Sequence, residues 1–220
     1  NVVTAAVARK VNKVIAVSTD KAVKPVNAMG MTKALQEKLI LSDEITKDKT
    51  TFCCVRYGNV LGSRGSVIPL WDKRLEKNKP LPITHPDMTR FVLTLSQAID
   101  LVFYSLKNGK GGEIFVKKAP ATKMINLARA YAELKTGKKN YPLEYIGIRA
   151  GEKIDEVLVS EEEMRRVSEK KDHFVIKRES LIDKNYLKKS TKLVEYGSGT
   201  IPPLNTEDLK LLMKKLKWVL

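Results

Sequence analysis

The sequence is poor in cysteine and histidine, and each shortage excludes a class of protein. Its two cysteines, Cys53 and Cys54, are adjacent in an apolar run, where strand neighbours point to opposite faces and are poorly placed to form a disulfide. Two cysteines and two distant histidines give no zinc-ligand spacing, so no metal is expected. No apolar run reaches the roughly 18 residues that a membrane span requires. We therefore expect a protein of a reducing, cytoplasmic compartment without a membrane segment.

Aromatic residues are also scarce, at 6%, and no basic run is interleaved with them. This weakens the case for a nucleic-acid partner, because single strands are bound by stacking on aromatic rings. Positive charge is plentiful: 41 Lys and Arg face 25 Asp and Glu, a net charge of +16. The excess is either a solvated lysine-rich surface or a site for an anionic partner such as a phosphorylated small molecule.

Short apolar runs alternate with amphipathic segments along the chain, which predicts a doubly wound α/β fold. With 43% hydrophobic residues, 220 residues can form one core and a small lobe. Ser96, Thr122 and Thr206 are expected to cap helices. From about residue 141 the pattern loosens, which indicates a smaller α+β lobe over 141–220. Strands are expected at 14–18, 51–55, 91–93 and 113–116, and helices at 1–8, 29–48, 67–77, 96–106, after 122, and at 207–218.

The first cluster of chemical groups, Ser18-Thr19-Asp20-Lys21, directly follows an apolar strand. Open α/β sheets place their ligands at the carboxyl ends of strands. A carboxylate and an ammonium group side by side at that edge could serve as acid and base. The same four residues could instead be a turn with a surface ion pair.

The second cluster places Met29 and Lys33 on one face of a helix, four residues apart. The run from Ser18 to Lys33, with Pro25 and Asn27 between them, resembles the inverting UDP-N-acetylglucosamine 4,6-dehydratases and capsule-polysaccharide enzymes. These belong to the extended short-chain dehydrogenases/reductases. In that superfamily a Tyr usually stands where Met29 stands, and a thioether has no proton to exchange.

The third cluster is the glycine-containing loop at 55–69, whose glycines let the backbone approach a ligand closely. It is similar to the family loop that covers the nicotinamide and holds the sugar pyrophosphate. The resemblance implies cofactor contacts from Tyr57 and Gly58, joined by Ser18 and Lys33. It also implies that the loop binds substrate through Asn59, Gly65, Ser66 and Val67.

Two further segments, 84–91 and 149–153, match the family in the expected order. The resemblance implies that Arg90 reaches the nucleotide phosphates, that Arg149 grips the diphosphate and that Glu152 bonds the ribose. The physical chemistry agrees, because an arginine fork suits phosphate oxygens and a carboxylate accepts two vicinal hydroxyls.

The family reaction implies a role for each group after the first strand. The sugar is oxidised at C4, loses water across C5 and C6, and is reduced at C6, with NADP (NAD as second choice) carrying the hydride. By position, Lys21 resembles the C5 base, Asp20 the acid at the 6-hydroxyl, and Thr19 the group that bonds the 4-hydroxyl. The implied partners are a UDP-sugar and further copies of the chain in a homo-oligomer.

The dinucleotide fingerprint G-x-G-x-x-G is absent from the sequence. We expect residues 1–140 to be the C-terminal part of a Rossmann-like domain, with 57–95 contributing to the substrate site. An upstream segment would supply the first βα units, and the chain alone could be inactive. The alternatives are a UDP-sugar epimerase or reductase of the same superfamily, a non-catalytic nucleotide-sugar-binding module, and a basic nucleic-acid binder.

Overall fold

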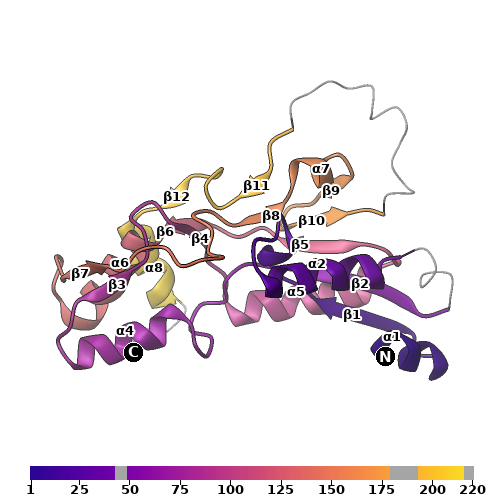
Figure 1. Cartoon of the computed structure of the whole chain (residues 1–220), viewed down its shortest axis with the longest axis horizontal. Helices are drawn as coiled ribbons and strands as arrows, with labels where there is room; N and C mark the ends of the chain where they lie inside the picture. The colour runs from indigo at the N-terminus through magenta and orange to yellow at the C-terminus, as the bar shows by residue number, and fades with distance from the viewer. Residues whose placement is uncertain (43–48, 179–192, 216–220) are drawn as a thin grey trace. The chain divides into compact units, whose positions relative to one another are not determined.

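The computed structural model describes residues 1–42, 49–178 and 193–215, and the chain divides into two compact units (Figure 1). Because the chain passes from one unit to the other five times, each unit is built from three separate segments. Unit 1 comprises Asn1–Gly58, Thr94–Lys118 and Val157–Gly197, and unit 2 comprises Asn59–Leu93, Ala119–Glu156 and Ser198–Leu220.

Unit 1 contains a five-stranded sheet in the order β1-β2-β5-β10-β9. The first three strands are parallel, in the register Val14↔Phe52 and Cys54↔Ile114, and the last two run antiparallel. The β2 run from Phe52 to Val55 is fully buried, as expected of a parallel strand with helices on both faces. The strands are β1 (Lys13–Val17), β2 (Thr51–Arg56), β5 (Ile114–Lys117), β10 (His173–Ile176) and β9 (Val167–Glu169).

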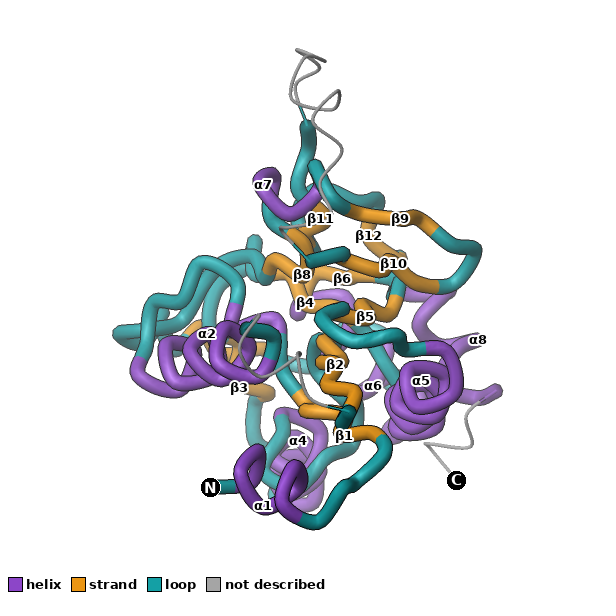
Figure 2. The backbone as a smooth tube through the Cα atoms, turned by 90° about the vertical axis from the view of Figure 1, so that its right-hand side faces the viewer, coloured by secondary structure: helices purple, strands orange, loops and turns teal. Residues whose placement is uncertain are grey.

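Helices flank this sheet on both sides, and Figure 2 shows α2 and α5 on opposite sides of β1 and β2. On the α5 side, Leu101 packs with Cys53, Val55 and Phe115. The arrangement confirms the doubly wound α/β fold. The remaining elements of unit 1 are α1 (Val2–Ala8), η1 (Asp20–Ala22), α2 (Ala28–Ile40), α5 (Leu95–Asn108), β8 (Val157–Val159), α7 (Glu161–Met164) and β11 (Tyr196–Gly197).

Unit 2 has its own core, formed where two small sheets meet three helices. Trp71, Leu81, Leu127, Tyr131 and Leu209 are almost fully buried there, and the Trp71 ring nitrogen donates to a carbonyl of β3 at 3.2 Å. One sheet has the order β12-β6-β4 and the other pairs β3 with β7. The elements are α4 (Val67–Glu76), β3 (Leu81–Ile83), β4 (Thr89–Phe91), β6 (Ala121–Lys123), α6 (Met124–Thr136), β7 (Leu143–Tyr145), β12 (Pro203–Leu204) and α8 (Thr206–Lys215).

The division into units differs from the lobe boundary expected near residue 141. Residues 157–197 lie in unit 1, because β10 extends the parallel sheet by pairing with β5, and residues 59–93 lie in unit 2. A pattern that loosens along the sequence cannot reveal a strand that returns to an earlier sheet.

Several elements differ in extent from those expected. Helix α2 ends at Ile40, where the next amide, of Leu41, bonds back to Glu37 O; residues 43–48 lie outside the described residues. The strand expected at 91–93 is β4, two residues earlier. Helix α8 is described to Lys215, so its expected end at 218 lies outside the described residues. The expected helix at 67–77 is confirmed as α4.

Helix α5 has a different cap from the one expected. Thr94 is its N-cap: its hydroxyl accepts from the Gln97 amide at 3.1 Å, while the Gln97 side chain accepts from the Thr94 amide at 3.0 Å. This reciprocal capping box places Ser96 inside the first turn, so the prediction of Ser96 as the cap is wrong.

The caps expected for the two later helices are also wrong. Thr122 lies in β6, and its hydroxyl donates to Leu204 O at 3.0 Å, so it joins two strands. At α8 the side chain of Asn205 accepts from the Asp208 amide at 2.9 Å, and Thr206 is already helical. The pattern of the sequence alone did not distinguish the capping residue of a helix from its neighbours.

Cys53 and Cys54 are free and buried thiols, as their adjacency predicted. No helix in the described ranges combines the length and the apolar character that crossing a bilayer requires.

Candidate functional site

The end of β1 carries a buried carboxylate. Asp20 is completely buried, and its Oδ1 accepts from the Thr19 hydroxyl at 2.7 Å and from Lys21 Nζ at 2.9 Å. Its Oδ2 is also buried and has no hydrogen-bond partner among the described residues. A buried carboxylate oxygen without a partner is costly, and this oxygen is free to accept a hydrogen bond.

The neighbouring strand holds this turn in place. The Ser18 amide donates to Val55 O at 2.7 Å and the Asp20 amide donates to Tyr57 O at 3.3 Å. The Ser18 hydroxyl is a second buried oxygen without a hydrogen-bond partner in the described ranges. Burial raises the pKa of the Tyr57 phenol.

Helix α2 packs closely against this turn because one of its residues is a glycine. A Cβ on Gly30 would lie 2.3 Å from the Lys21 carbonyl oxygen, so no other residue fits without a shift. Asn27 caps the helix, its side-chain oxygen accepting from the Gly30 amide at 2.8 Å. The Asn27–Gly30 pair therefore fixes the first turn of α2 against the residues that follow β1.

The next turn of α2 brings an ammonium group to the end of the same strand. Lys33 Nζ donates to Val17 O at 2.9 Å and to Gln36 Oε1 at 3.0 Å. Val17 is the last residue of β1, so Lys33 and the Thr19-Asp20-Lys21 turn are held at one strand end. Met29, one turn earlier, is 48% exposed, which leaves room around its side chain.

Unit 1 also contains a buried charge network that the sequence did not suggest. Arg56 is 1% exposed and donates to both carboxylate oxygens of Glu37 (3.0 and 2.5 Å), to both of Glu163 (3.0 Å each) and to Leu158 O at 2.9 Å. Burial alone would raise the pKa of Glu163, but Arg56 holds it below its ordinary value. The sequence indicated this network only by one feature: a charged residue, Arg56, ends a mostly apolar strand.

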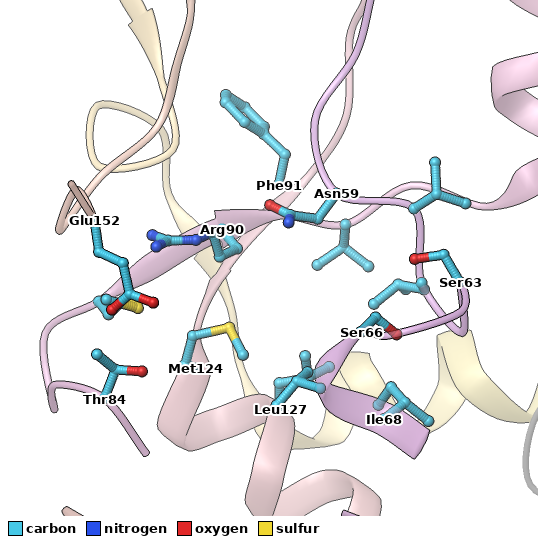
Figure 3. Close-up of a pocket in the computed structure, with 15 residues that line it drawn as sticks. Asn59, Ser63, Ser66, Ile68, Thr84, Arg90, Phe91, Met124, Leu127 and Glu152 are labelled. Carbon is cyan, nitrogen blue, oxygen red and sulfur yellow. The ribbon is translucent and has the colours of Figure 1, made fainter. Parts of the chain in front are cut away.

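Unit 2 contains a partly enclosed cavity of about 210 Å³, shown in Figure 3. Polar groups of Asn59, Arg90 and Glu152 lie along one part of its wall, and Met124 and Leu127 lie across from them. A mostly apolar cavity with a few convergent polar groups is typical of a small-molecule site.

Arg90 is held in this wall by backbone carbonyls. Its Nη1 donates to Thr89 O at 2.6 Å and to Ile154 O at 2.9 Å, and its Nη2 donates to Lys153 O at 2.9 Å. These bonds attach the segment after residue 149 to β4. Arg90 therefore also has a positioning role, which the sequence did not indicate.

A second and more open cavity of about 740 Å³ shares the walls of the first at Ser66, Val67, Thr84 and Glu152. Positive side chains also line it, among them Arg149. Every substrate-binding residue predicted in unit 2 lines one or both cavities: Asn59, Gly65, Ser66, Val67, Arg90, Arg149 and Glu152. The convergence of Asn59 with Asp20, Lys21 and Lys33 stays a prediction.

Sequence reasoning missed most of the cavity lining. Thr84 was noted only as part of the segment 84–91, and Met124, Leu127, Arg64 and Lys73 were given no role. In the described part of the chain, no group of three or more His, Cys, Asp or Glu could hold a metal ion.

The sheet and the residues at the end of β1 define a Rossmann-like protein of the extended short-chain dehydrogenase/reductase type. The chain belongs to the polysaccharide biosynthesis protein family, whose model matches residues 1–178. The resemblance found in the motifs is thereby confirmed.

The alignments with curated relatives cover the whole of this chain, and the relatives are longer. It is 44% identical over 228 residues to a protein named UDP-glucose 4-epimerase from Rickettsia bellii (strain OSU 85-389), and 42% identical to one of the same name from Rickettsia rickettsii (strain Sheila Smith). Each alignment covers 100% of this chain and 66% of the relative. The chain thus spans slightly less than two thirds of these relatives.

Solved structures agree with the fold. The X-ray structure of Pen from Bacillus thuringiensis matches with a TM-score of 0.88 at 37% identity, covering 100% of this chain and 66% of that one. A dTDP-glucose 4,6-dehydratase from Bacillus anthracis, in complex with NAD, matches with a TM-score of 0.59 at 17% identity over 68% of this chain and 54% of its own. At that identity the second likeness concerns the fold alone.

Proposed function

We propose that this chain carries the acid–base groups and the nucleotide-binding cavity of a nucleotide-sugar 4,6-dehydratase acting on UDP-N-acetylglucosamine. The supporting observation is the pair that follows β1, in which the partly exposed Lys21 Nζ lies 2.9 Å from Oδ1 of the buried Asp20. Elimination of water needs a base at C5 and an acid at C6, and two adjacent groups of opposite type meet that need.

The hydrogen bond between these groups explains how one pair can serve both purposes. If its proton moves from Lys21 to Asp20, the ion pair becomes a neutral amine and a carboxylic acid. The amine then takes the C5 proton, and the acid protonates the departing 6-hydroxyl, which leaves as water. Both groups end in their starting forms, an ammonium and a carboxylate. Burial of Asp20 lowers the cost of the neutral pair relative to separated charges.

A nicotinamide cofactor would supply the hydride acceptor at C4 and the donor at C6. The residues present fit its ribose and nicotinamide side: Lys33 reaches the end of β1, and the Ser18 hydroxyl is buried without a hydrogen-bond partner among the described residues. We propose NADP, with NAD as the second choice. Thr19 donates its proton to Asp20, so toward a sugar 4-hydroxyl it would act as an acceptor.

The experiment that tests this function is conversion of UDP-N-acetylglucosamine by the whole protein with NADP⁺ in D₂O, followed by NMR. A dehydratase gives a C6 methyl group and deuterium at C5. The second candidate is a 4-epimerase, which is favoured by the printed names of the curated relatives. It would invert C4, retain the C6 hydroxymethyl group and leave C5 without deuterium, and that result would refute the dehydratase.

Lys21→Ala should abolish dehydration while sparing oxidation at C4, because only the second step needs the C5 base. The expected signal is enzyme-bound NADPH absorbance that forms and then persists. The matched control is Lys24→Ala, since Lys24 lies three residues further along the chain and pairs at the surface with Glu195. Loss of even the first NADPH signal would show that Lys21 takes the 4-hydroxyl proton in place of the Tyr that usually stands at the position of Met29.

In that case, adding Met29→Tyr to the Lys21→Ala variant should restore the NADPH signal, because the half-exposed site can take a ring.

A further inference from the structure

Helix α2 is held against the rest of unit 1 on either side of Lys33. The two buried residues of this helix are Gly30 and Glu37, and Lys33 lies between them. Spacings of three and four residues place all three on one face of the helix. The helix is described over its whole length, and no apolar side chain of it is buried. The contacts at Gly30 and Glu37 therefore have a large share in fixing where the Lys33 amine lies.

The contact at Glu37 is directional. Its two carboxylate oxygens accept from Arg56 Nε at 3.0 Å and from Arg56 Nη2 at 2.5 Å. A paired contact between a guanidinium and a carboxylate defines both the separation and the relative orientation of the two groups. Apolar packing is non-directional and would allow the helix to turn or slide. The pair can therefore fix the rotation of α2 as well as its distance from β2, which ends at Arg56.

The Arg56 guanidinium is itself fixed from another direction. It donates to Leu158 O at 2.9 Å and to both carboxylate oxygens of Glu163 at 3.0 Å. With the two bonds to Glu37, these contacts use all five N–H donors of the guanidinium. Glu163 is held in turn by the Ser160 amide, which donates to it at 3.0 Å in a capping box. Glu37 is thus bonded to a group that has no freedom to follow α2 if the helix moves.

The bonds that Lys33 makes are weaker constraints than this network. Lys33 Nζ donates to Val17 O at 2.9 Å, and Gln36 Nε2 donates to the same oxygen at 3.2 Å. Both bonds are exposed to solvent, so water competes for each partner and the net stabilisation is small. The bonds between Arg56 and Glu37 are buried, where electrostatic interactions are stronger. The buried pair, one helical turn away, therefore holds Lys33 at the end of β1.

We propose that Glu37 and Arg56 are positioning residues that hold Lys33 where it can bind the ribose of a nicotinamide cofactor. The cofactor role of Lys33 rests on the proposed function, whereas the coupling of Glu37 to Lys33 rests on the contacts of α2. Both positioning residues are buried and act through Lys33. Glu163 supports Arg56 but does not lie on α2, so its replacement should leave Lys33 in place while Glu37 still binds the guanidinium.

The test is the affinity of the whole protein for NADP⁺ and for NAD⁺, measured by isothermal titration in a matched pair of variants. Glu37→Gln and Glu163→Gln each remove one negative charge beside the same guanidinium, but only Glu37 lies on α2. Glu37→Gln should weaken binding of the preferred cofactor by about tenfold, as expected when one charge-assisted hydrogen bond is misplaced. Glu163→Gln should change this affinity by no more than about twofold. Circular dichroism establishes that each variant is folded.

A double variant determines whether Glu37 acts through Lys33. Lys33→Ala removes the amine itself, so in that background Glu37→Gln has no ammonium group left to misplace. The two losses of affinity should therefore not add, and the double variant should bind the cofactor as Lys33→Ala alone does. A general loosening of the structure would instead weaken binding by the same factor in both backgrounds.

The inference is overturned if neither cofactor binds the wild-type protein, if Glu37→Gln binds as the wild type does, or if Glu163→Gln weakens binding equally. It is also overturned if the losses from Glu37→Gln and Lys33→Ala add, since Glu37 would then act at another place. The expected pattern of affinities together with no turnover of UDP-N-acetylglucosamine would refute the proposed function and leave the positioning role standing.

Discussion

Replacing Glu163 should destabilise unit 1 far more than its position in a four-residue helix suggests. Both of its carboxylate oxygens bind Arg56 at 3.0 Å, and Arg56 is almost fully buried. Glu163→Ala leaves that guanidinium with Glu37 as its remaining carboxylate. The variant loses two hydrogen bonds to a charged, buried group and the capping-box side chain, which together should cost about 3–5 kcal/mol. Glu163→Gln keeps a capping-box residue but loses the charge, and we expect a loss of about 1.5–3 kcal/mol.

Cysteine labelling measures this loss in the unit concerned. Cys53 and Cys54 lie on the strand that ends at Arg56 and are fully buried, so a thiol reagent reaches them only when that strand opens. The fraction labelled against urea gives the free energy of opening for each variant. The control is Glu144→Ala, which removes an exposed ion pair with Arg74 and should cost at most about 1 kcal/mol.

The pH dependence provides a second check on the same residue. The folded pKa of Glu163 is below its ordinary value of 4.5, so its contribution is fully present above that pH and is lost as the pH falls through the folded pKa. The difference in the free energy of opening between wild type and Glu163→Ala should therefore shrink below about pH 4.5. A difference in this free energy that is small at pH 7, or that persists unchanged in acid, would refute the assignment of the stability to this ion pair.

Two further predictions concern unit 1. Gly30→Ala should lower the free energy of unfolding by about 1–3 kcal/mol, because the new Cβ meets the Lys21 carbonyl oxygen at 2.3 Å; a urea midpoint equal to that of wild type would contradict the close approach of α2. Burial, followed by the charge of Lys117, lowers the pKa of His173 below 6.5, so the unfolded chain takes up the proton first and stability should fall as the pH drops through 6.5. His173→Phe should remove that pH dependence in thermal melting, and a persisting slope would assign it to another group.

The sequence predicted the parts of the fold in which each strand is followed by its own helix. Val14 to Val17 and the β2 run have the apolar character of buried parallel strands, and the glycine-containing loop separated β2 from α4 as expected. The pairing of strands that lie far apart in the sequence could not be predicted. His173 to Ile176 carries no sign that it will pair antiparallel with β5, because a four-residue strand is chosen by its partner.

The candidate site divides in the same way. Asp20 and Lys21 were predicted from their place directly after an apolar strand, and Lys33 from the family resemblance of the run from Ser18 to Lys33; both are local properties of the sequence. The Arg56 network was missed because its partners Glu37 and Glu163 lie 19 and 107 residues away in the chain. Lys73 was missed because a single lysine on an amphipathic helix carries no sign in the sequence that it lines a cavity.

The interleaved course of the chain limits how this protein can be taken apart or recombined. Neither unit corresponds to a continuous stretch, so no single cut in the gene yields one of them alone. Exchanging unit 2 with the corresponding part of a relative would require three replacements at once, at 59–93, 119–156 and 198–220. Changing single residues in the cavity walls of unit 2 is therefore a simpler experiment on this chain than grafting the whole unit.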